Sequence, residues 1–229
     1  MREALCVAIV GAESTGKSAL AHALAPRLQA EFGLACAVVD EYLREWCDRQ
    51  GRTPRADEQL GIADEQQRRI DAAAASGVDL VLCDTTPVMI AVYSELLFAD
   101  RSFVDHARRA HAGADFTLLT ALDLPWVADG LMRDGPHVRE PVDRLVREHL
   151  RACGCDWAVV GGSGQARTAG AIAALRPTLA RRGRDAAAPR GLFSALVAAD
   201  TGPRQDAGCA LRGFCELCDR GDLEHLARK

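Results

Sequence analysis

The 229-residue sequence lacks any apolar run approaching the roughly 20 residues that a membrane-spanning helix needs. Its first residues lead directly into a strand-like segment, without the regions that make up a signal peptide. These two absences lead us to expect a soluble cytoplasmic protein with no membrane partner. No repeat of solenoid length is found, which excludes a repeat architecture.

The chain also lacks an excess of positive charge. It contains 28 Lys and Arg residues against 32 Asp and Glu residues, which gives a formal net charge of −4 at pH 7. Proteins that coat DNA or RNA carry a basic surface, so we expect no nucleic-acid partner. Hydrophobic residues make up 48% of the chain and charged residues 26%, which excludes a largely disordered protein.

The number of cysteines is odd, so they cannot all be paired in disulfide bonds within one chain. The chain has 9 cysteines, and Cys6, Cys36 and Cys83 lie inside apolar segments. In such segments a free cysteine behaves as a small hydrophobic residue. We therefore do not expect disulfide bonds to form the framework of the fold.

Short apolar segments alternate with helical segments along most of the chain. Buried strands are predicted at residues 5–10, 35–40, 78–83, 116–122 and 157–160. Helices are predicted at residues 17–31, 56–76, 87–97, 141–152 and 165–182. The alternation predicts an α/β fold, a three-layer sandwich with a mostly parallel five-stranded sheet and helices on both faces.

Three details of the helices are also predicted. Pro26 marks a kink or an early end of the first helix. One face of the helix over residues 56–76, including Leu60 and Ile70, is expected to be buried. His106 and His111 are five residues apart on a further helix and are expected to be solvated rather than metal-binding.

Residues 11–18 fit the pattern G-x-x-x-x-G-K-[ST], after a buried strand and at the start of a helix. In this context the backbone N–H groups and the helix N-terminus bind phosphate. Lys17 reaches the outer phosphates, and the Ser18 hydroxyl ligates Mg²⁺. The residues expected to bind ATP are Gly11, Ala12, Glu13, Ser14, Thr15, Gly16, Lys17, Ser18 and Ala19.

Carboxylates follow two of the other predicted strands. Asp84 ends one strand and is expected to hold the Mg²⁺ shell, although it or Thr85 would also suit the N-cap of the next helix. Asp40 and Glu41 follow the second strand, and either is expected to accept the proton of an attacking hydroxyl group. The alternative for this pair is a solvated helix start whose acids complement the helix dipole.

A polar segment over residues 124–141 follows the fourth strand, where small kinases place a lid. Arg133 and Arg139 are expected to stabilise the charge of a transferring phosphoryl group when the lid closes and excludes water. Trp126 lies in the same segment and is expected either to contact substrate or to pack against the sheet edge.

Three blocks in this order resemble one family, the nicotinamide riboside kinase domain of NadR-type proteins, within the AAA-like P-loop ATPases. The blocks are residues 11–18, 40–45 and 125–131, with Asp84 and Thr85 matching an Asp-Thr pair after the third strand. The resemblance covers roughly residues 5 to 180. The family's lid arginine directly follows Asp-Gly-Leu, whereas here Met132 intervenes and Arg133 takes its place.

The resemblance implies transfer of the ATP γ-phosphate to the 5′-hydroxyl of nicotinamide riboside, with Mg²⁺ as the metal. The catalytic residues it implies are Lys17, Asp40, Glu41, Asp84, Arg133 and Arg139. The substrate-binding residues it implies are Glu41, Tyr42, Arg44, Trp126 and Asp129. Since the nicotinamide ring is a pyridinium cation, the face of Trp126 or Tyr42 would attract it by about 1–2 kcal/mol when desolvated.

The sequence leaves other functions open. One is a kinase for another nucleoside, and another is a regulatory P-loop ATP-binding protein read by a protein partner. A mechanical AAA+ motor is disfavoured because we find no second helical domain after the core. We expect a stand-alone kinase unit that acts on a small-molecule nucleoside, and a homo-oligomer is not excluded.

The composition changes near residue 184, which predicts a kinase-like P-loop domain over residues 1–184 and a small Cys-containing appendage over residues 185–229. Four residues of this appendage have a pattern that suits a tetrahedral zinc site: Cys209, Cys215, Cys218 and His225. A reduced tail and a helical flap are the alternatives. Gly161–Gly164 is interpreted as an ordinary loop.

Overall fold

A parallel five-stranded sheet lies at the centre of the fold, with the strand order β2-β3-β1-β4-β5. The computed structural model describes residues 4–127 and 135–187. The strands are β1 (Leu5–Val10), β2 (Cys36–Val39), β3 (Leu80–Asp84), β4 (Phe116–Thr120) and β5 (Trp157–Val160). The carboxyl ends of all five strands meet at one edge, where ligands of such sheets bind.

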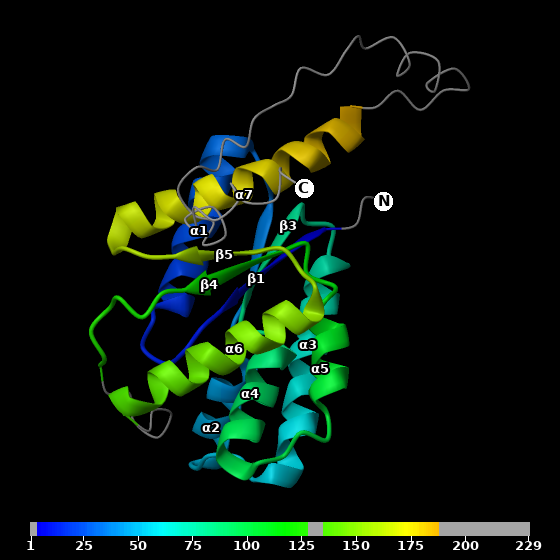
Figure 1. Cartoon of the computed structure of the whole chain (residues 1–229). Helices are drawn as coiled ribbons and strands as arrows, with labels where there is room; N and C mark the ends of the chain where they lie inside the picture. The colour runs from blue at the N-terminus through cyan, green and yellow to red at the C-terminus, as the bar shows by residue number, and fades with distance from the viewer. Residues whose placement is uncertain (1–3, 128–134, 188–229) are drawn as a thin grey trace, which may run out of the picture. The chain divides into compact units, whose positions relative to one another are not determined.

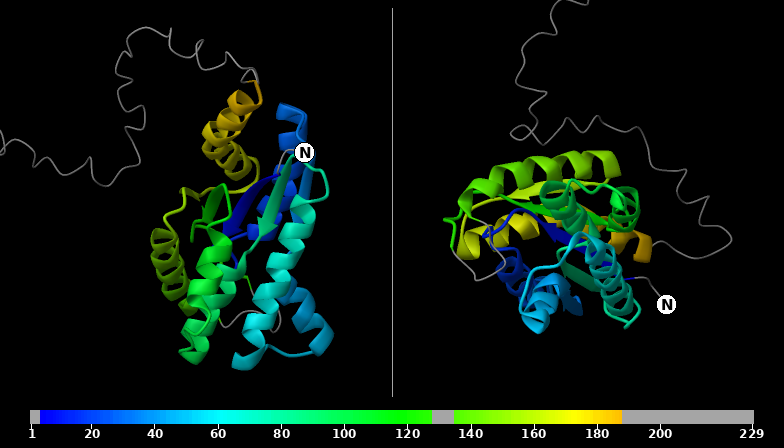
Figure 2. Two further views of the ribbon diagram at one scale, coloured as in Figure 1. Left: turned by 90° about the vertical axis from the view of Figure 1, so that its right-hand side faces the viewer. Right: turned by 90° about the horizontal axis from the view of Figure 1, so that it is seen from below.

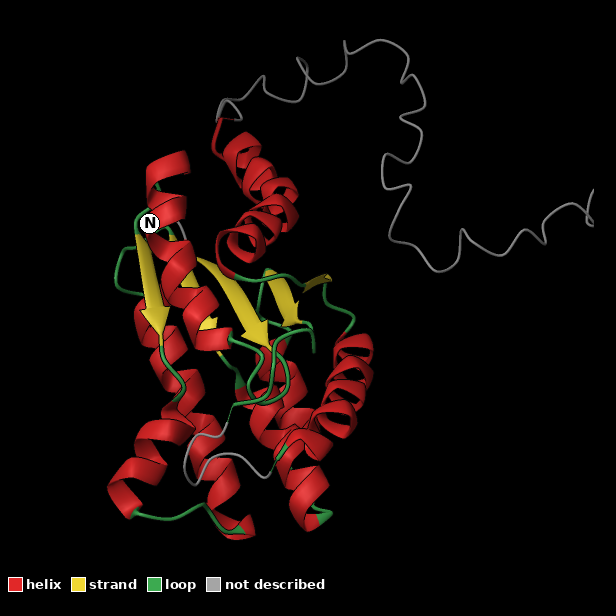
Figure 3. Ribbon diagram, turned by 90° about the vertical axis from the view of Figure 1, so that its left-hand side faces the viewer, coloured by secondary structure: helices red, strands yellow, loops and turns green. Residues whose placement is uncertain are grey.

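Helices cover both faces of the sheet (Figure 1). The helices are α1 (Lys17–Phe32), α2 (Tyr42–Gln50), α3 (Gln59–Ala74), α4 (Pro87–Phe98), α5 (Val104–His111), α6 (Arg139–Cys153) and α7 (Gly164–Ala187). Two short 3-10 turns, η1 (Ala56–Glu58) and η3 (Pro136–Val138), precede α3 and α6. Figures 2 and 3 show the sheet between the two helical layers.

The two faces of β1 belong to different apolar clusters, which explains its burial. Val7 and Ile9 pack with leucines of α1 and with α7, whereas Ala8 and Val10 pack with α4 and α6. A third cluster joins α2, α3, α4 and α5, and includes Leu43 and Cys47 of α2. The predicted three-layer α/β sandwich is confirmed, and the predicted bounds of β5 are those observed.

The helix predicted over residues 17–31 is confirmed, because α1 continues past Pro26 to Phe32, and of the two alternatives for Pro26 the early end is excluded. Leu24 and Leu28, on either side of the proline, are fully buried. The predicted buried face of the next long helix is wrong at one position. Leu60 is 43% exposed, since the first turn of α3 turns Gln59 inward instead.

One prediction about a side chain is also wrong. His111 is buried rather than solvated, and its two ring nitrogens hydrogen-bond the hydroxyl groups of Thr86 (2.8 Å) and Thr117 (3.1 Å). His106 is half exposed and bonds Asp64 at 2.7 Å, as a surface histidine does. The spacing of the two histidines along the chain carries no information about their burial.

The chain divides into two units after residue 183. The predicted zinc ligands Cys209, Cys215, Cys218 and His225 lie outside the described residues, so the appendage and its metal stay predictions. Within residues 4–127 and 135–187, no cluster of three or more His, Cys, Asp or Glu side chains suits a metal ion. In the same residues no helix is long and apolar enough to cross a membrane.

Candidate phosphate and acceptor site

The turn between β1 and α1 has the backbone conformation of an anion-binding loop. Gly16 and Ser14 have φ angles of 76° and 55°, and such left-handed residues let successive N–H groups face a common point. Gly11 has a φ of 146°, and a Cβ atom there would lie 2.1 Å from the Thr120 hydroxyl. Only glycine therefore fits where the loop leaves β1.

Hydrogen bonds tie this loop to the neighbouring strand β4. The buried Thr15 hydroxyl donates to the Ala12 carbonyl (2.7 Å) and shares a 2.6 Å hydrogen bond with the Thr120 hydroxyl. Because each hydroxyl has one proton and that of Thr15 goes to Ala12, Thr120 Oγ1 donates to Thr15, and the Val10 carbonyl oxygen lies 3.1 Å from Thr120 Oγ1. These contacts connect the loop to the end of β4.

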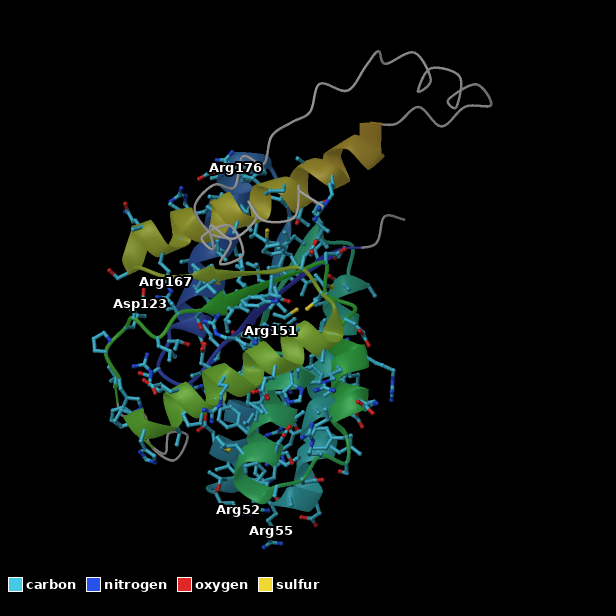
Figure 4. The ribbon with its side chains drawn as sticks, viewed as in Figure 1. Arg52, Arg55, Asp123, Arg151, Arg167 and Arg176 are labelled. Carbon is cyan, nitrogen blue, oxygen red and sulfur yellow. The ribbon has the colours of Figure 1, made fainter. Side chains whose placement is uncertain are left out.

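Arg167 of α7 fixes the other side of the loop and was not identified from the sequence. Its guanidinium donates to the Thr15 carbonyl (2.9 Å), to the Gly162 carbonyl (2.7 Å) and to Asp123 (2.9 Å). Figure 4 labels Arg167 and Asp123. Burial acts to raise the pKa of Asp123, but the Gly162 N–H group and Arg167 outweigh it and hold that pKa below its ordinary value. Residues 161–164 are thereby connected to the phosphate loop.

Lys17, Ser18 and Asp84 come together at the start of α1. The Lys17 ammonium donates to the Ala12 carbonyl (3.0 Å). Asp84 is 1% exposed, and burial raises its pKa, against the opposing effects of a hydrogen bond with Ser18 and the charge of Lys17. One Asp84 oxygen, Oδ1, has no hydrogen-bond partner within the described chain. A carboxylate oxygen beside a hydroxyl suits a Mg²⁺ ion, so these residues fit the metal.

The alternative role of Asp84 or Thr85 as a helix cap is wrong. The N-cap of α4 is Thr86, whose side chain makes no capping hydrogen bond. Thr85 instead adopts a φ of 79° and donates its N–H group to the Ile9 carbonyl (3.0 Å). The turn after β3 therefore presents Asp84 toward Ser18 rather than toward the helix.

Asp40 and Glu41 follow β2 at the same edge of the sheet. Asp40 is 69% exposed and hydrogen-bonds His22 of α1 at 2.7 Å. Glu41 is half-buried and is the N-cap residue of α2, without a side-chain capping bond. Both carboxylates line the cavity described next, beside the phosphate loop.

A cavity of about 950 Å³ opens from the phosphate loop between α2 and α4. At the loop end it is lined by residues 13–19, Asp40, Glu41, Arg44 and Asp84. Away from the loop it is lined by Leu43, Cys47, Pro54, Gln59, Tyr93, Leu97 and Phe98. The cavity is thus polar at the phosphate loop and largely apolar along α4, and it is larger than a phosphate group alone requires.

The structure does not bring Tyr42 into this cavity. The Tyr42 ring stacks against the Arg69 guanidinium (4.3 Å to the ring centre), and its hydroxyl accepts a hydrogen bond from Arg49 (2.9 Å). Its backbone N–H group donates to Gln66 (2.7 Å). Tyr42 therefore joins α2 to α3 and shapes the cavity wall from behind.

The lid residues are described only in part. Asp129 and Arg133 lie outside the described residues. Trp126 is half-buried with no hydrogen-bond partner for its Nε1 in the described chain, and it does not line the cavity. Arg139, the first residue of α6, is buried outside the cavity lining, and its Nε and one Nη have no partner among the described residues. Val127 donates its N–H group to the Ser14 hydroxyl (2.8 Å), which connects this segment to the phosphate loop.

Solved structures of other proteins share the fold of this chain. A solved structure of a NadR protein in complex with NR is similar to this chain, with a TM-score of 0.62 and 18% sequence identity. The match covers 76% of this chain and 50% of the NadR chain, so this chain spans half the length of that relative. Thymidylate kinase from Ehrlichia chaffeensis matches with a TM-score of 0.55 and 13% identity, over 77% of this chain and 100% of that one.

At these identities the two structures establish a shared fold, and they confirm the resemblance to NadR-type P-loop proteins at that level. A search of curated proteins by sequence found no match. A family model described as an AAA domain matches residues 6–167, which begin in β1 and end at Arg167. Because that match includes the phosphate loop and more than half of the sequence, the chain belongs to this AAA domain family.

Proposed function

We propose that this protein is an ATP- and Mg²⁺-dependent kinase that phosphorylates the 5′-hydroxyl group of a nucleoside, with nicotinamide riboside as the preferred acceptor. One observation carries the proposal. The phosphate loop and Asp84 open directly into a cavity of about 950 Å³ with Asp40 and Glu41 at the junction. A phosphate donor, a metal site, a proton acceptor and room for a second substrate are therefore contiguous.

The phosphate end of the site has its roles assigned from its contacts. Residues 11–19 bind the ATP phosphates, and Lys17 exchanges its bond to the Ala12 carbonyl for a phosphate oxygen. Ser18 and Asp84 hold Mg²⁺, with Asp84 Oδ1 as the available ligand atom. The metal supplies positive charge that neutralises the phosphate oxygens.

Glu41 is the better placed of the two candidate proton acceptors. The Asp40 carboxylate bonds His22 and is largely in solvent, whereas Glu41 is half-buried beside the phosphate loop. We assign the orientation and deprotonation of the acceptor hydroxyl to Glu41, with Asp40 as the alternative. Arg44 of α2 lines the cavity, and we assign it a contact with the acceptor. The resemblance assigns Arg133 and Arg139 to the transferring phosphoryl group, but Arg139 does not line the cavity and Arg133 lies outside the described residues.

The charge of the cavity favours a cationic acceptor over an anionic one. Its carboxylates are Glu13, Asp40, Glu41, Glu45, Asp48 and Asp84, and its cationic side chains are Lys17, Arg44 and Arg49. This excess of negative charge would repel the phosphate of a nucleotide acceptor and attract a pyridinium ring. The similar NadR structure, solved in complex with NR, supports the same choice. The resemblance assigns contacts with the ring and the ribose to Trp126 and Asp129, but Trp126 does not line the cavity and Asp129 lies outside the described residues.

A panel of nucleosides tests the proposal. The purified protein is incubated with ATP, Mg²⁺ and each nucleoside, and formation of ADP and of the phosphorylated product is measured. We expect nicotinamide riboside to be the best acceptor and Lys17→Met to abolish turnover. If thymidine or another nucleoside were phosphorylated and nicotinamide riboside were not, the kinase activity would be supported and the proposed substrate contradicted. ATP turnover that no nucleoside stimulates would contradict the kinase and support a regulatory ATP-binding protein.

A further inference from the structure

Gln59 is a buried amide in the wall of the cavity, away from the groups that handle phosphate. It is 2% exposed, yet it is one of the residues that line the cavity. Its side-chain oxygen, Oε1, has no hydrogen-bond partner in the described part of the chain. Since burying an unpaired amide oxygen costs free energy, such a group at a cavity wall is typical of a ligand contact.

Gln66, two turns further along α3, shows what a structural glutamine looks like here. It is fully buried, its Oε1 accepts a hydrogen bond from the Tyr42 N–H group (2.7 Å) and its Nε2 donates to the Asp40 carbonyl (3.4 Å). Both ends of that amide are used to join α2 to α3. Gln59 lies on the same helix, and no such pairing satisfies its Oε1.

The backbone that carries Gln59 is held firmly. Glu58, its neighbour, receives two hydrogen bonds from Arg52 (2.7 and 2.6 Å) and one from the Arg55 N–H group (2.7 Å). Figure 4 shows Arg52 and Arg55 at the end of the molecule where α4 also ends. The chain is thus anchored at the residue that directly precedes Gln59, at the start of α3.

The part of the cavity far from the phosphate loop lies where the base of a nucleoside would lie, as the length of α4 between them indicates. Helix α4 begins at Pro87, beside Asp84, and contributes Tyr93, Leu97 and Phe98 to the cavity. At 1.5 Å per residue these three side chains lie about 9 to 16 Å along the helix from its start. An acceptor whose hydroxyl group meets the phosphate loop extends its ring into this apolar part.

We propose that Gln59 recognises the base of the acceptor and selects a ring that carries a hydrogen-bond donor beside an acceptor, as a primary carboxamide does. The proposal rests on the kinase function proposed above, because it assumes an acceptor in the same cavity. A side-chain amide offers both an N–H donor and a C=O acceptor, so it pairs with a carboxamide in two complementary hydrogen bonds. A carboxylate offers no donor, and a methyl ketone offers only an acceptor.

Wild-type protein tests the proposal with three pyridinium ribosides that differ only at this group. They carry a carboxamide, a carboxylate and an acetyl group, and kcat and KM are measured for each with saturating ATP and Mg²⁺. We expect kcat/KM to be at least about 100-fold higher for the carboxamide, since sites built to hydrogen-bond a substrate group reject analogues without it. Equal kcat/KM values for the carboxamide and acetyl ribosides would overturn the proposal.

The variant Gln59→Leu removes the amide while keeping a side chain of similar size. We expect its KM for the carboxamide riboside to rise by about 10-fold or more and its preference over the acetyl riboside to disappear, with the KM for ATP within twofold of wild type. The control is Gln50→Leu, an exposed residue of α2 outside the cavity lining, which should leave all constants unchanged. Unchanged selectivity in folded Gln59→Leu would contradict the assignment.

Binding measurements separate this proposal from the kinase function. Calorimetry of the three ribosides with wild-type protein and a non-hydrolysable ATP analogue reports selectivity without turnover. Selective binding of the carboxamide riboside without phosphorylation would contradict the proposed kinase activity and support the proposed recognition by Gln59. Phosphorylation of all three ribosides with equal efficiency would contradict the proposed recognition by Gln59 and support the proposed kinase activity. No binding of any riboside would overturn both.

Discussion

Gly11 shows how a single residue determines the shape of the phosphate loop. A Cβ atom at this position would lie 2.1 Å from the Thr120 hydroxyl and 3.1 Å from the Thr120 carbonyl oxygen, and the φ angle of 146° is unfavourable for other residues. The same hydroxyl also bonds Thr15, so the clash would reach the hydrogen bonds that hold the loop.

We predict that Gly11→Ala destabilises the protein by about 3 kcal/mol and prevents ATP binding, because the loop must move away from β4. Gly61→Ala is the matched control. Gly61 lies in α3 with open space around its Cβ position, so alanine there should stabilise the fold by about 0.5–1 kcal/mol. Urea unfolding and calorimetric titration with ATP measure both effects. Normal ATP affinity in Gly11→Ala would show that the loop tolerates the shift.

Individual residues also show what a sequence can and cannot predict. The position of residues 11–18 between a buried strand and a helix could be predicted because the pattern lies within one turn of the chain, and the structure confirms that position. Gln59 and Arg167 could not, because their roles depend on partners that are distant in sequence. Arg167 bonds Thr15 across 152 positions, and Gln59 acquires its role only when α2 and α4 close a cavity around it.

At the scale of elements, the turn η1 sets the start of α3 through one carboxylate. Glu58 accepts hydrogen bonds from Arg52 and from the Arg55 N–H group, and these lower its pKa from 4.5 to about 2. A carboxyl group with a lowered pKa in the folded protein stabilises the fold above its unfolded pKa. That stabilisation is lost as the pH falls from about 4.5 toward about 2.

We predict that Glu58→Gln has a lower urea midpoint than wild type at pH 7, by a small amount because Glu58 is solvent-accessible. The difference should shrink as the pH falls below 4.5, where the wild-type carboxyl group begins to lose its advantage. Asp57→Asn in the same turn is the control. A difference that stays constant between pH 7 and pH 3 would contradict the assigned role of the Glu58 charge.

Helix α7 is connected to the phosphate loop chiefly through Arg167. Its guanidinium satisfies two carbonyl groups and Asp123, so its loss leaves several polar groups without partners. We predict that Arg167→Met destabilises the fold by about 2–3 kcal/mol and raises the KM for ATP more than the KM for the acceptor. Arg176→Met, an exposed arginine on the same helix, should change neither quantity appreciably. A normal KM for ATP in folded Arg167→Met would leave the residue only a structural role.

The elements themselves were predictable to different degrees. Strands such as β5 are short apolar runs closed by glycine, so their bounds follow from composition. The buried face of α3 was assigned less well, because Leu60 and Gln59 are adjacent and hydrophobicity alone favours the wrong one of the two. The burial of Gln59 reflects the packing of α3 against α2 and α4, which no local pattern encodes.

At the scale of the whole molecule, the remaining question is whether residues 185–229 carry a metal. The pattern of Cys209, Cys215, Cys218 and His225 offers four ligands that zinc prefers, and no comparable cluster exists among the described residues. None of these four residues has a role in the proposed kinase, whose assigned residues lie between Gly11 and Arg139.

A zinc site is one of three interpretations of residues 185–229, beside a reduced tail and a helical flap, and elemental analysis after dialysis distinguishes them. The zinc interpretation predicts one zinc ion per wild-type chain and none in the double variant Cys215→Ser/Cys218→Ser. Because the cavity is separate in sequence from these cysteines, the double variant should keep the wild-type kcat for its nucleoside acceptor. Cys36→Ser, a half-buried thiol in β2, is the control and should keep the metal. A metal-free wild-type chain would contradict the zinc site, whereas loss of both zinc and activity would show that the appendage supports the kinase.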